Sequence, residues 1–236
     1  MFSNPRAMLT IGPALAAVLL ACSVPGASAP AAAATRFTTR IDNPWYPLRP
    51  GTTFVYTGTK DGKPTRDVYR VTRQTRTIAG VRCVVVEDRL DEAGHLEERT
   101  RDYYVQDARG NVWYFGEDTA ELDARGHVTS TEGTWHAGVR NARAGIFMPA
   151  HPAVGEHHRQ EYDKGNAEDQ FRVRSLHARI TVPYGSFRNV LQTHEFTRLE
   201  PGTLDAKYYV RGVGEVLETS IKGPKERAAL VDIRHG

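Results

Sequence analysis

Short runs of alternating apolar and polar residues fill the chain from about residue 50 onward. Five such runs, rich in Val, Tyr, Thr and Phe, come first: 52–58, 66–78, 81–90, 96–106 and 111–116. A period of two is typical of β-strands, and turns containing Asp and Gly separate the runs. The turns DEAGH, DARGN and DARGH each place Gly three residues after Asp, as suits a hairpin tip. No stretch keeps a helical apolar period over three turns, so the sequence predicts an all-β protein.

The pattern of strands and turns occurs twice along the chain. Residues 50–116 and 154–222 carry similar turns and strands in the same order, with Gly51 corresponding to Gly155. Ordered self-similarity of this kind indicates a duplicated unit. We therefore expect two pseudo-repeated antiparallel five-stranded meanders and a final strand at 227–233. Because the open edges of a long meander invite aggregation, the sheet should be strongly curved or form an incomplete barrel.

Residues 117–153 lie between the two copies and have no counterpart in either. Long connections without a repeat partner usually have a structural or functional role. We expect this segment to form a cap over the concave face or the mouth of the sheet. The repeats, the cap and the final strand together make one predicted β domain over 43–236.

The start of the chain has the composition of an export signal followed by a tether. A positive residue precedes the apolar run 8–20, which is too short for a comfortable membrane span. The sequence LLAC then resembles the lipobox at which bacterial lipoproteins are cleaved and lipidated. We predict a signal peptide over 1–22 with lipid-modified Cys22, a flexible tether over 23–42, and attachment to the cell membrane or envelope. The alternative is cleavage after Ala29 and free secretion.

Composition and charge narrow the possible partners. The chain is 40% hydrophobic and 25% charged, with a net charge of +3, which is typical of a globular domain. Its basic residues are spread along the predicted strands instead of forming a stripe, so we expect no nucleic-acid partner. Without Cys22, Cys83 has no cysteine to pair with, and its β-branched neighbours favour a small buried side chain over a nucleophile.

Acidic residues and histidines are concentrated in and around 117–153. Carboxylate oxygens and an imidazole are ligands for divalent cations, so Glu117, Asp118 and His136 form a candidate metal site. Such a site would make the protein a metal-dependent hydrolase, which is one alternative function. However, the spacing matches no calcium-loop or zinc motif. We therefore assign no catalytic residue and favour a non-enzymatic role.

Aromatic residues indicate a different kind of site. Capped antiparallel barrels often hold ligands inside, and aromatic side chains line such cavities. We expect an apolar ligand or lipid to contact aromatic residues of both repeats and the cap, with one basic anchor: Trp113, Trp135, Phe147, Tyr104, Tyr209 and Arg159. The same aromatic residues are also explained by packing in the core, and Arg159 by a structural salt bridge. In that case the protein would be a structural or partner-binding surface protein, which is the remaining alternative.

The strings VWYFGEDT, STEGTW, AGIFMPAHP, VPYGSF and KYYVRGVG follow one another within 43–231. In this order they resemble an uncharacterised family of exported bacterial proteins, many of them lipoprotein-like and frequent in actinobacteria. The resemblance implies an envelope location and an all-β fold. It implies no activity, so no functional residue is carried over.

Overall fold

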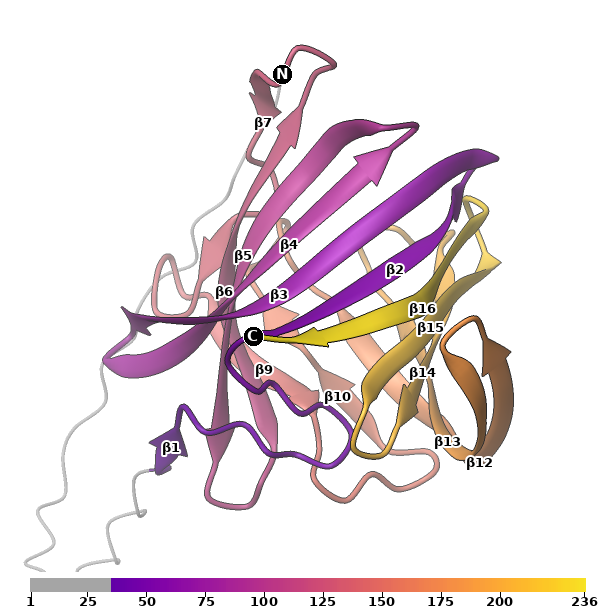
Figure 1. The fold of residues 1–236 in the computed structure, drawn as a ribbon. Coiled ribbons are helices and arrows are strands. Elements are labelled where there is room, and N and C mark those ends of the chain that lie inside the picture. Colours follow the sequence, from indigo (N-terminus) through magenta and orange to yellow (C-terminus); the bar gives the residue numbers. More distant parts are fainter. Residues whose placement is uncertain (1–34) are drawn as a thin grey trace, which may run out of the picture. The chain divides into compact units, whose positions relative to one another are not determined.

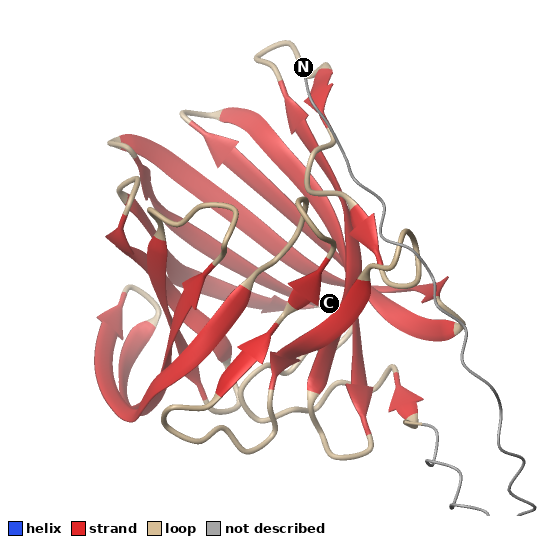
Figure 2. Ribbon diagram, turned by 180° about the vertical axis from the view of Figure 1, so that it is seen from behind, coloured by secondary structure: helices blue, strands red, loops and turns tan. Residues whose placement is uncertain are grey.

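The computed structural model describes residues 35–236, and these residues form strands, turns and loops without a helix (Figures 1 and 2). The all-β prediction is therefore confirmed. Within the described part there is accordingly no helix that could cross a membrane. The predicted signal peptide, Cys22 and most of the predicted tether lie outside the described residues.

The strands follow the predicted runs closely. In chain order they are β1 (Phe37–Thr38), β2 (Thr52–Lys60), β3 (Lys63–Ile78), β4 (Val81–Glu92), β5 (His95–Asp107), β6 (Val112–Leu122), β7 (Val128–Ser130), β8 (Trp135–His136), β9 (Arg143–Met148), β10 (His157–Arg159), β11 (Glu161–Tyr162), β12 (Gln170–Val182), β13 (Gly185–Phe196), β14 (Leu204–Val210), β15 (Gly214–Lys222) and β16 (Glu226–His235).

These strands build one antiparallel sheet that curls into a nearly closed barrel (Figure 1). The order is β10-β12-β13-β14-β15-β16-β2-β3-β4-β5-β6-β9-β11. Its two ends are brought together by one short segment, because β10 pairs with β12, β11 pairs with β9, and Gln160 alone separates β10 from β11. A Cβ added at Gly145 in β9 would lie 2.1 Å from the carbonyl oxygen of Arg159 in β10. The absent side chain of Gly145 thus permits this closure.

The two halves of the barrel begin with the same turn. The N–H groups of Gly51 and Gly155 donate to Val71 and Val173 at 2.8 and 2.9 Å. Both glycines have positive φ, +93° and +90°, a conformation that favours Gly. The turns are alike, while the duplication of the whole unit stays a prediction.

Residues 117–153, which were predicted to cap the barrel, form strands of the sheet instead of a separate lid. Strand β6 continues through residues 117–122, and β7, β8 and β9 all pair with β6. Much of 117–153 therefore extends the sheet, either as part of β6 or beside it. The side chain of Trp135 in this segment is buried and packs edge-on against Tyr114.

One end of the barrel is filled by residues 41–48, which cross it as an irregular loop (Figure 1). Trp45, Tyr46 and Leu48 are buried, and an isolated bridge joins Ile41 to Leu48. Asn43 is 1% exposed and fixes the loop, since its amide nitrogen donates to the carbonyl oxygens of residues 110 and 148 at 2.8 and 3.3 Å. The ordered domain thus begins before residue 43, where the tether was expected to end.

Candidate functional site

The interior of the barrel is lined by acidic side chains as well as aromatic ones. Neighbouring residues of a strand face opposite sides of the sheet. On β3, β4 and β5, the inward positions include Asp67, Asp88 and Asp102, and on β15 they include Glu215 and Glu218. The barrel interior is therefore strongly acidic, although the chain as a whole has a net charge of +3.

These residues surround a cavity of about 180 Å³, the inner chamber, which lies next to the loop 41–48. Its lining combines aromatic side chains, carboxyl groups and one lysine: Tyr46, Phe54, Tyr56, Tyr69, Tyr104, Phe147, Asp67, Asp88, Asp102, Glu215, Glu218 and Lys207, together with Pro47, Leu48, Gly214 and Ala228. Ligand pockets usually exceed about 300 Å³. This space suits a small molecule and is too small for a lipid.

A second cavity of about 100 Å³, the outer chamber, continues the first. The two share Tyr56, Asp67, Asp88, Glu218 and Ala228 as lining residues. The outer chamber adds two further carboxyl groups, those of Glu98 and Glu226. The two chambers therefore adjoin, and both have acidic groups in their walls.

Only part of this negative charge is neutralised within the described residues. The Nζ atom of Lys207 lies 3.3 Å from Glu195 and 3.5 Å from Glu218. Burial alone would lower the pKa of Lys207, but the negative charges of these two glutamates and of Glu215 raise it well above its usual range. Lys207 is therefore protonated, and its positive charge is shared between Glu195 and Glu218.

The other six carboxyl groups that line the chambers form no salt bridge with a described residue: Asp67, Asp88, Glu98, Asp102, Glu215 and Glu226. The Oδ1 atoms of Asp67 and Asp88 are buried and receive no hydrogen bond from a donor group, although the two carboxyl side chains hydrogen-bond to each other. A buried acid without a partner is costly when ionised. Burial accordingly raises the pKa of all six carboxyl groups and disfavours their ionised forms.

The pKa values of these groups follow from that environment. Burial, followed by the negative charge of Asp88, raises the pKa of Asp67 well above its ordinary range. Burial raises the pKa of Asp102 to about 8, although its Oδ1 accepts a 2.6 Å hydrogen bond from the hydroxyl of Tyr114. Burial likewise raises the pKa of Glu215 to about 8. Several of these groups therefore titrate near neutral pH.

The end of the inner chamber next to the loop 41–48 is aromatic. The ring of Tyr46 lies 4.7 Å from Phe147, 5.7 Å from Tyr104 and 6.3 Å from Tyr209, measured between centroids. The hydroxyl groups of Tyr46 and Tyr69 lie 2.5 Å apart. Aromatic faces carry negative potential, so this end also favours a cation.

The structure divides five of the six predicted ligand contacts between two places, whereas Trp135 packs against Tyr114 away from both. Tyr104 and Phe147 line the inner chamber, and the buried ring of Tyr209 packs against Tyr46 beside it. Trp113 and Arg159 instead lie together at a separate surface hollow of about 560 Å³. There Arg159 stacks on Tyr162 at 4.4 Å, so it does not anchor a ligand in the barrel cavity.

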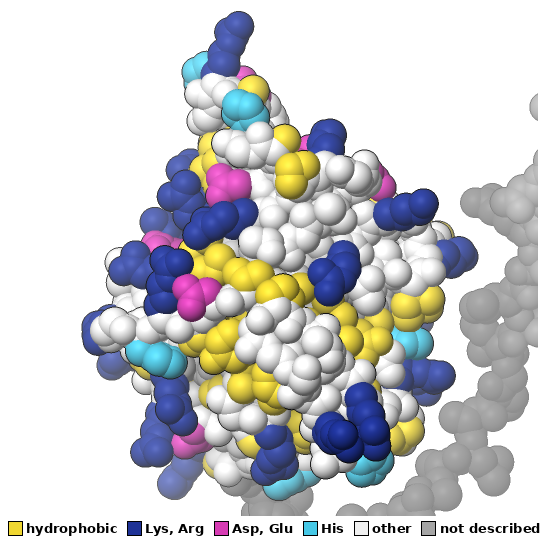
Figure 3. Space-filling view, turned by 45° about the vertical axis from the view of Figure 1, so that its right-hand side comes forward, with side chains coloured by type: hydrophobic (Ala, Val, Ile, Leu, Met, Phe, Trp, Pro, Cys, Tyr) yellow, Lys and Arg dark blue, Asp and Glu magenta, His cyan; other side chains and the backbone are white. Residues whose placement is uncertain are grey.

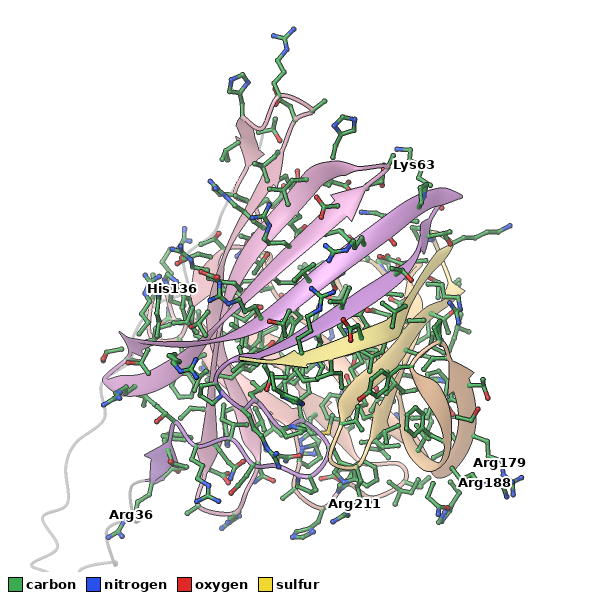
Figure 4. All side chains as sticks on the ribbon, viewed as in Figure 1. Arg36, Lys63, His136, Arg179, Arg188 and Arg211 are labelled. Carbon is green, nitrogen blue, oxygen red and sulfur yellow. The ribbon has the colours of Figure 1, made fainter. Side chains whose placement is uncertain are left out.

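The predicted metal ligands are also separated. The Nε2 atom of His136 lies 2.9 Å from Asp118, which also accepts a 2.5 Å hydrogen bond from the Tyr103 hydroxyl and pairs with Arg76. Glu117, the neighbour of Asp118 on β6, faces the opposite side of the sheet. Figure 4 shows His136 at the side of the barrel. Among residues 35–236, no group of His, Cys, Asp or Glu is arranged to hold a metal ion.

The sequence contained a signal for the acidic interior that composition alone conceals. Three successive strands carry Arg and Asp as neighbours, at 66–67, 88–89 and 101–102. In each pair the Asp lies near aromatic or β-branched residues that share its face. Because neighbouring residues of a strand face opposite sides, this pattern would have predicted that the three aspartates point into the barrel and the three arginines point outward.

Comparison with known proteins finds solved structures of low sequence identity. No family model matches the sequence, and no curated protein matches it. A Bacteroides fragilis structure, described with a YmcC-like fold and proposed to be exported, has 17% identity and a TM-score of 0.46, covering 80% of this chain and 98% of that chain. A Parabacteroides distasonis structure, proposed to be a lipoprotein, has 14% identity and a TM-score of 0.45, covering 80% and 97%. Neither organism is an actinobacterium, and the family resemblance seen in the sequence stays a prediction.

Proposed function

We propose that this protein is an exported, envelope-anchored lipoprotein that binds a small cationic molecule, such as an aliphatic amine, inside its barrel. The anchoring part rests on the lipobox-like sequence that ends at Cys22. The binding part rests on one observation, the two adjoining chambers in which six carboxyl groups form no salt bridge with a described residue. An ammonium group would supply that partner.

The lining favours an organic amine over the apolar ligand expected from the sequence. An acyl chain would offer no donor to the carboxyl groups of Asp67 and Asp88, whose side chains would keep only the hydrogen bond between them. An ammonium group would instead form charge-assisted hydrogen bonds with them. The aromatic end of the inner chamber adds cation–π attraction, and an elongated diamine would match the two chambers.

The alternative functions have less support. A metal-dependent hydrolase would need Glu117, Asp118 and His136 to converge, and Glu117 lies on the other face of β6 from Asp118. A purely structural protein would not need unpaired acids inside its barrel, because apolar side chains of similar size would stabilise the core better. We therefore retain ligand binding as the function.

Calorimetric titration of the purified protein with putrescine and spermidine tests the proposal. Butane-1,4-diol and succinate, which lack positive charge, are the ligand controls and should not bind. The double substitution Asp67→Asn and Asp88→Asn should weaken amine binding at least about ten-fold, because it removes the charge-assisted hydrogen bonds. Glu132→Gln, at an exposed position, should leave the affinity unchanged.

Two results would contradict cation binding in the cavity. One is the absence of heat with every amine at pH 8, where the acids that titrate near neutral pH begin to ionise. The other is equal amine affinity for the wild type and the double variant. Cavity access can be checked separately by Ala228→Leu, which adds bulk to the shared wall of both chambers and should abolish binding of any occupant.

A further inference from the structure

The outer face of β4 and β5 carries a cluster of arginines that is independent of the cavity. In the register of these strands, Arg89 lies directly opposite Arg99, and Arg101 lies opposite Glu87. Arg99 and Arg101 are two residues apart and therefore share a face. All three arginines are exposed. The two strands lie side by side at the front of the barrel in Figure 1.

The arrangement of Arg89 and Arg99 is unfavourable by itself. Like charges directly opposite each other on neighbouring strands destabilise a sheet. Neither arginine forms a salt bridge with any residue of the described part of the chain. The cluster therefore holds positive charge that its own neighbours do not compensate.

The acids nearest the cluster already have partners. Glu87 lies 3.8 Å from both Arg70 and Arg101, so its single charge is shared between two arginines. Asp118 pairs with Arg76 and lies 2.9 Å from His136. Neither acid is thus free to neutralise Arg89 and Arg99.

The cluster also surrounds a hollow in the surface. The hollow has a volume of about 450 Å³ and is lined by Glu87, Asp88, Arg89, Arg99, Thr100, Arg101, Asp118, Thr119 and Ala120. Figure 3 shows Lys and Arg side chains at many places over one face of the barrel. Around this hollow, three arginines line one concave place.

We infer that Arg89, Arg99 and Arg101 form a binding site for a phosphoryl group. A guanidinium presents a planar fork of N–H donors that matches phosphate oxygens in a bidentate manner. A doubly charged phosphoryl group would remove the repulsion between Arg89 and Arg99 and would accept hydrogen bonds from both. The phosphoryl group could belong to a soluble compound or to the headgroup of an anionic lipid, since both present the same chemistry.

The barrel provides a matched control for this site. Arg179 and Arg188 are also exposed and directly opposite each other, on the β12–β13 hairpin. Figure 4 shows them side by side, projecting from the barrel at a distance from β4 and β5. Neither lines the hollow described above. Replacing this pair removes the same charge without changing the proposed site.

The experiment uses the full chain and two probes, inorganic pyrophosphate and dihexanoyl phosphatidylglycerol below its micelle-forming concentration. Binding is measured by calorimetry for the wild type, for Arg89→Gln with Arg99→Gln, and for Arg179→Gln with Arg188→Gln. We expect the first pair of substitutions to weaken binding at least about ten-fold and the control pair to change it less than about two-fold. Preference for the lipid probe would identify a headgroup as the source, and preference for pyrophosphate a soluble compound.

A second readout separates binding from a folding defect. Without any anion, Arg99→Gln should raise the melting temperature because it removes the repulsion with Arg89. Pyrophosphate should raise the melting temperature of the wild type and not that of the double variant. The inference is overturned if neither probe binds the wild type, or if both pairs of substitutions weaken binding equally, since net charge alone would then explain it.

Discussion

Replacing Asp102 with asparagine tests whether the acids inside the barrel are protonated in the folded protein. Asp102 is 6% exposed, and its Oδ1 accepts the hydrogen bond from the Tyr114 hydroxyl. Burial, followed by the negative charge of Asp88, raises the pKa of Asp102 to about 8. Asparagine has nearly the shape of protonated aspartic acid, and its amide oxygen can accept the same hydrogen bond. Asp102→Asn therefore removes the ionisation and little else.

The expected magnitude follows from proton linkage. In the unfolded chain Asp has a pKa of about 4, so between about pH 4 and 8 the unfolded state loses a proton that the folded state keeps. The stabilisation by the folded-state proton on Asp102 is complete below about pH 4 and is lost as the pH rises to about 8. One pH unit corresponds to about 1.4 kcal/mol, which amounts to about 3 kcal/mol between pH 5 and 7. Asp102→Asn has no ionisable group at this position, so its free energy of unfolding does not contain this decrease.

Urea unfolding at pH 5, 6 and 7 measures the difference. The free energy of unfolding of Asp102→Asn, relative to the wild type, should increase by about 3 kcal/mol from pH 5 to pH 7. Glu132→Gln, at the exposed position 132, should follow the wild type at each pH. A difference between Asp102→Asn and the wild type that stays constant with pH would show that Asp102 is ionised in the folded barrel, and the account of a protonated interior would be refuted.

Four other outcomes can be checked more briefly. Gly145→Ala should destabilise the barrel by about 1–3 kcal/mol in urea unfolding, because the added Cβ would meet the Arg159 carbonyl oxygen at 2.1 Å; an unchanged midpoint would refute the close approach. Asn43→Ala should cost about 3 kcal/mol in the same assay, because it removes the hydrogen bonds that fix the loop 41–48. Cys83 is fully buried, and burial raises the pKa of its thiol to about 12, so a thiol reagent should react with it only after unfolding. Cells fed labelled palmitate should label the wild type and not Cys22→Ala, whereas equal labelling would exclude Cys22 as the lipidation site.

The strands were predictable because one physical signal dominates this sequence. Alternation between apolar and polar residues, interrupted by turns of Asp and Gly, located β2 through β6 to within a few residues. The boundary at residue 116 was missed because Gly116 looks like the end of a strand. It has a φ of +140° and lies where the register of β6 against β5 shifts, so the strand continues to Leu122. An irregularity inside a strand cannot be distinguished from its end by local sequence alone.

The closure of the barrel could not be predicted from local patterns. It depends on a six-residue segment, 157–162, whose two halves pair with opposite edges of the sheet. The two strands in this segment, β10 and β11, are only three and two residues long. Alternation of apolar and polar residues cannot be recognised over so few positions. Its contacts are set by the position of Gly145, which is distant along the chain.

Charge summed over the whole chain conceals the candidate sites of this protein. A net charge of +3 and dispersed arginines suggested no concentrated field. Residues that are dispersed along the chain become neighbours when their strands pair, as Arg89 and Arg99 do. For a β-barrel, charge must therefore be counted separately for the two faces of each strand, once it is known which residues face the interior.

The two proposed sites follow from a single structural property, the register of β4 and β5. Asp88 and Arg89 are neighbours in sequence, as are Arg101 and Asp102, and in each pair the acid faces the cavity while the arginine faces solvent. A slip of one residue would exchange these faces, placing arginines in the cavity and acids outside. The barrel therefore separates opposite charges across the thickness of one sheet, so that an ammonium group and a phosphoryl group could each find a complementary face.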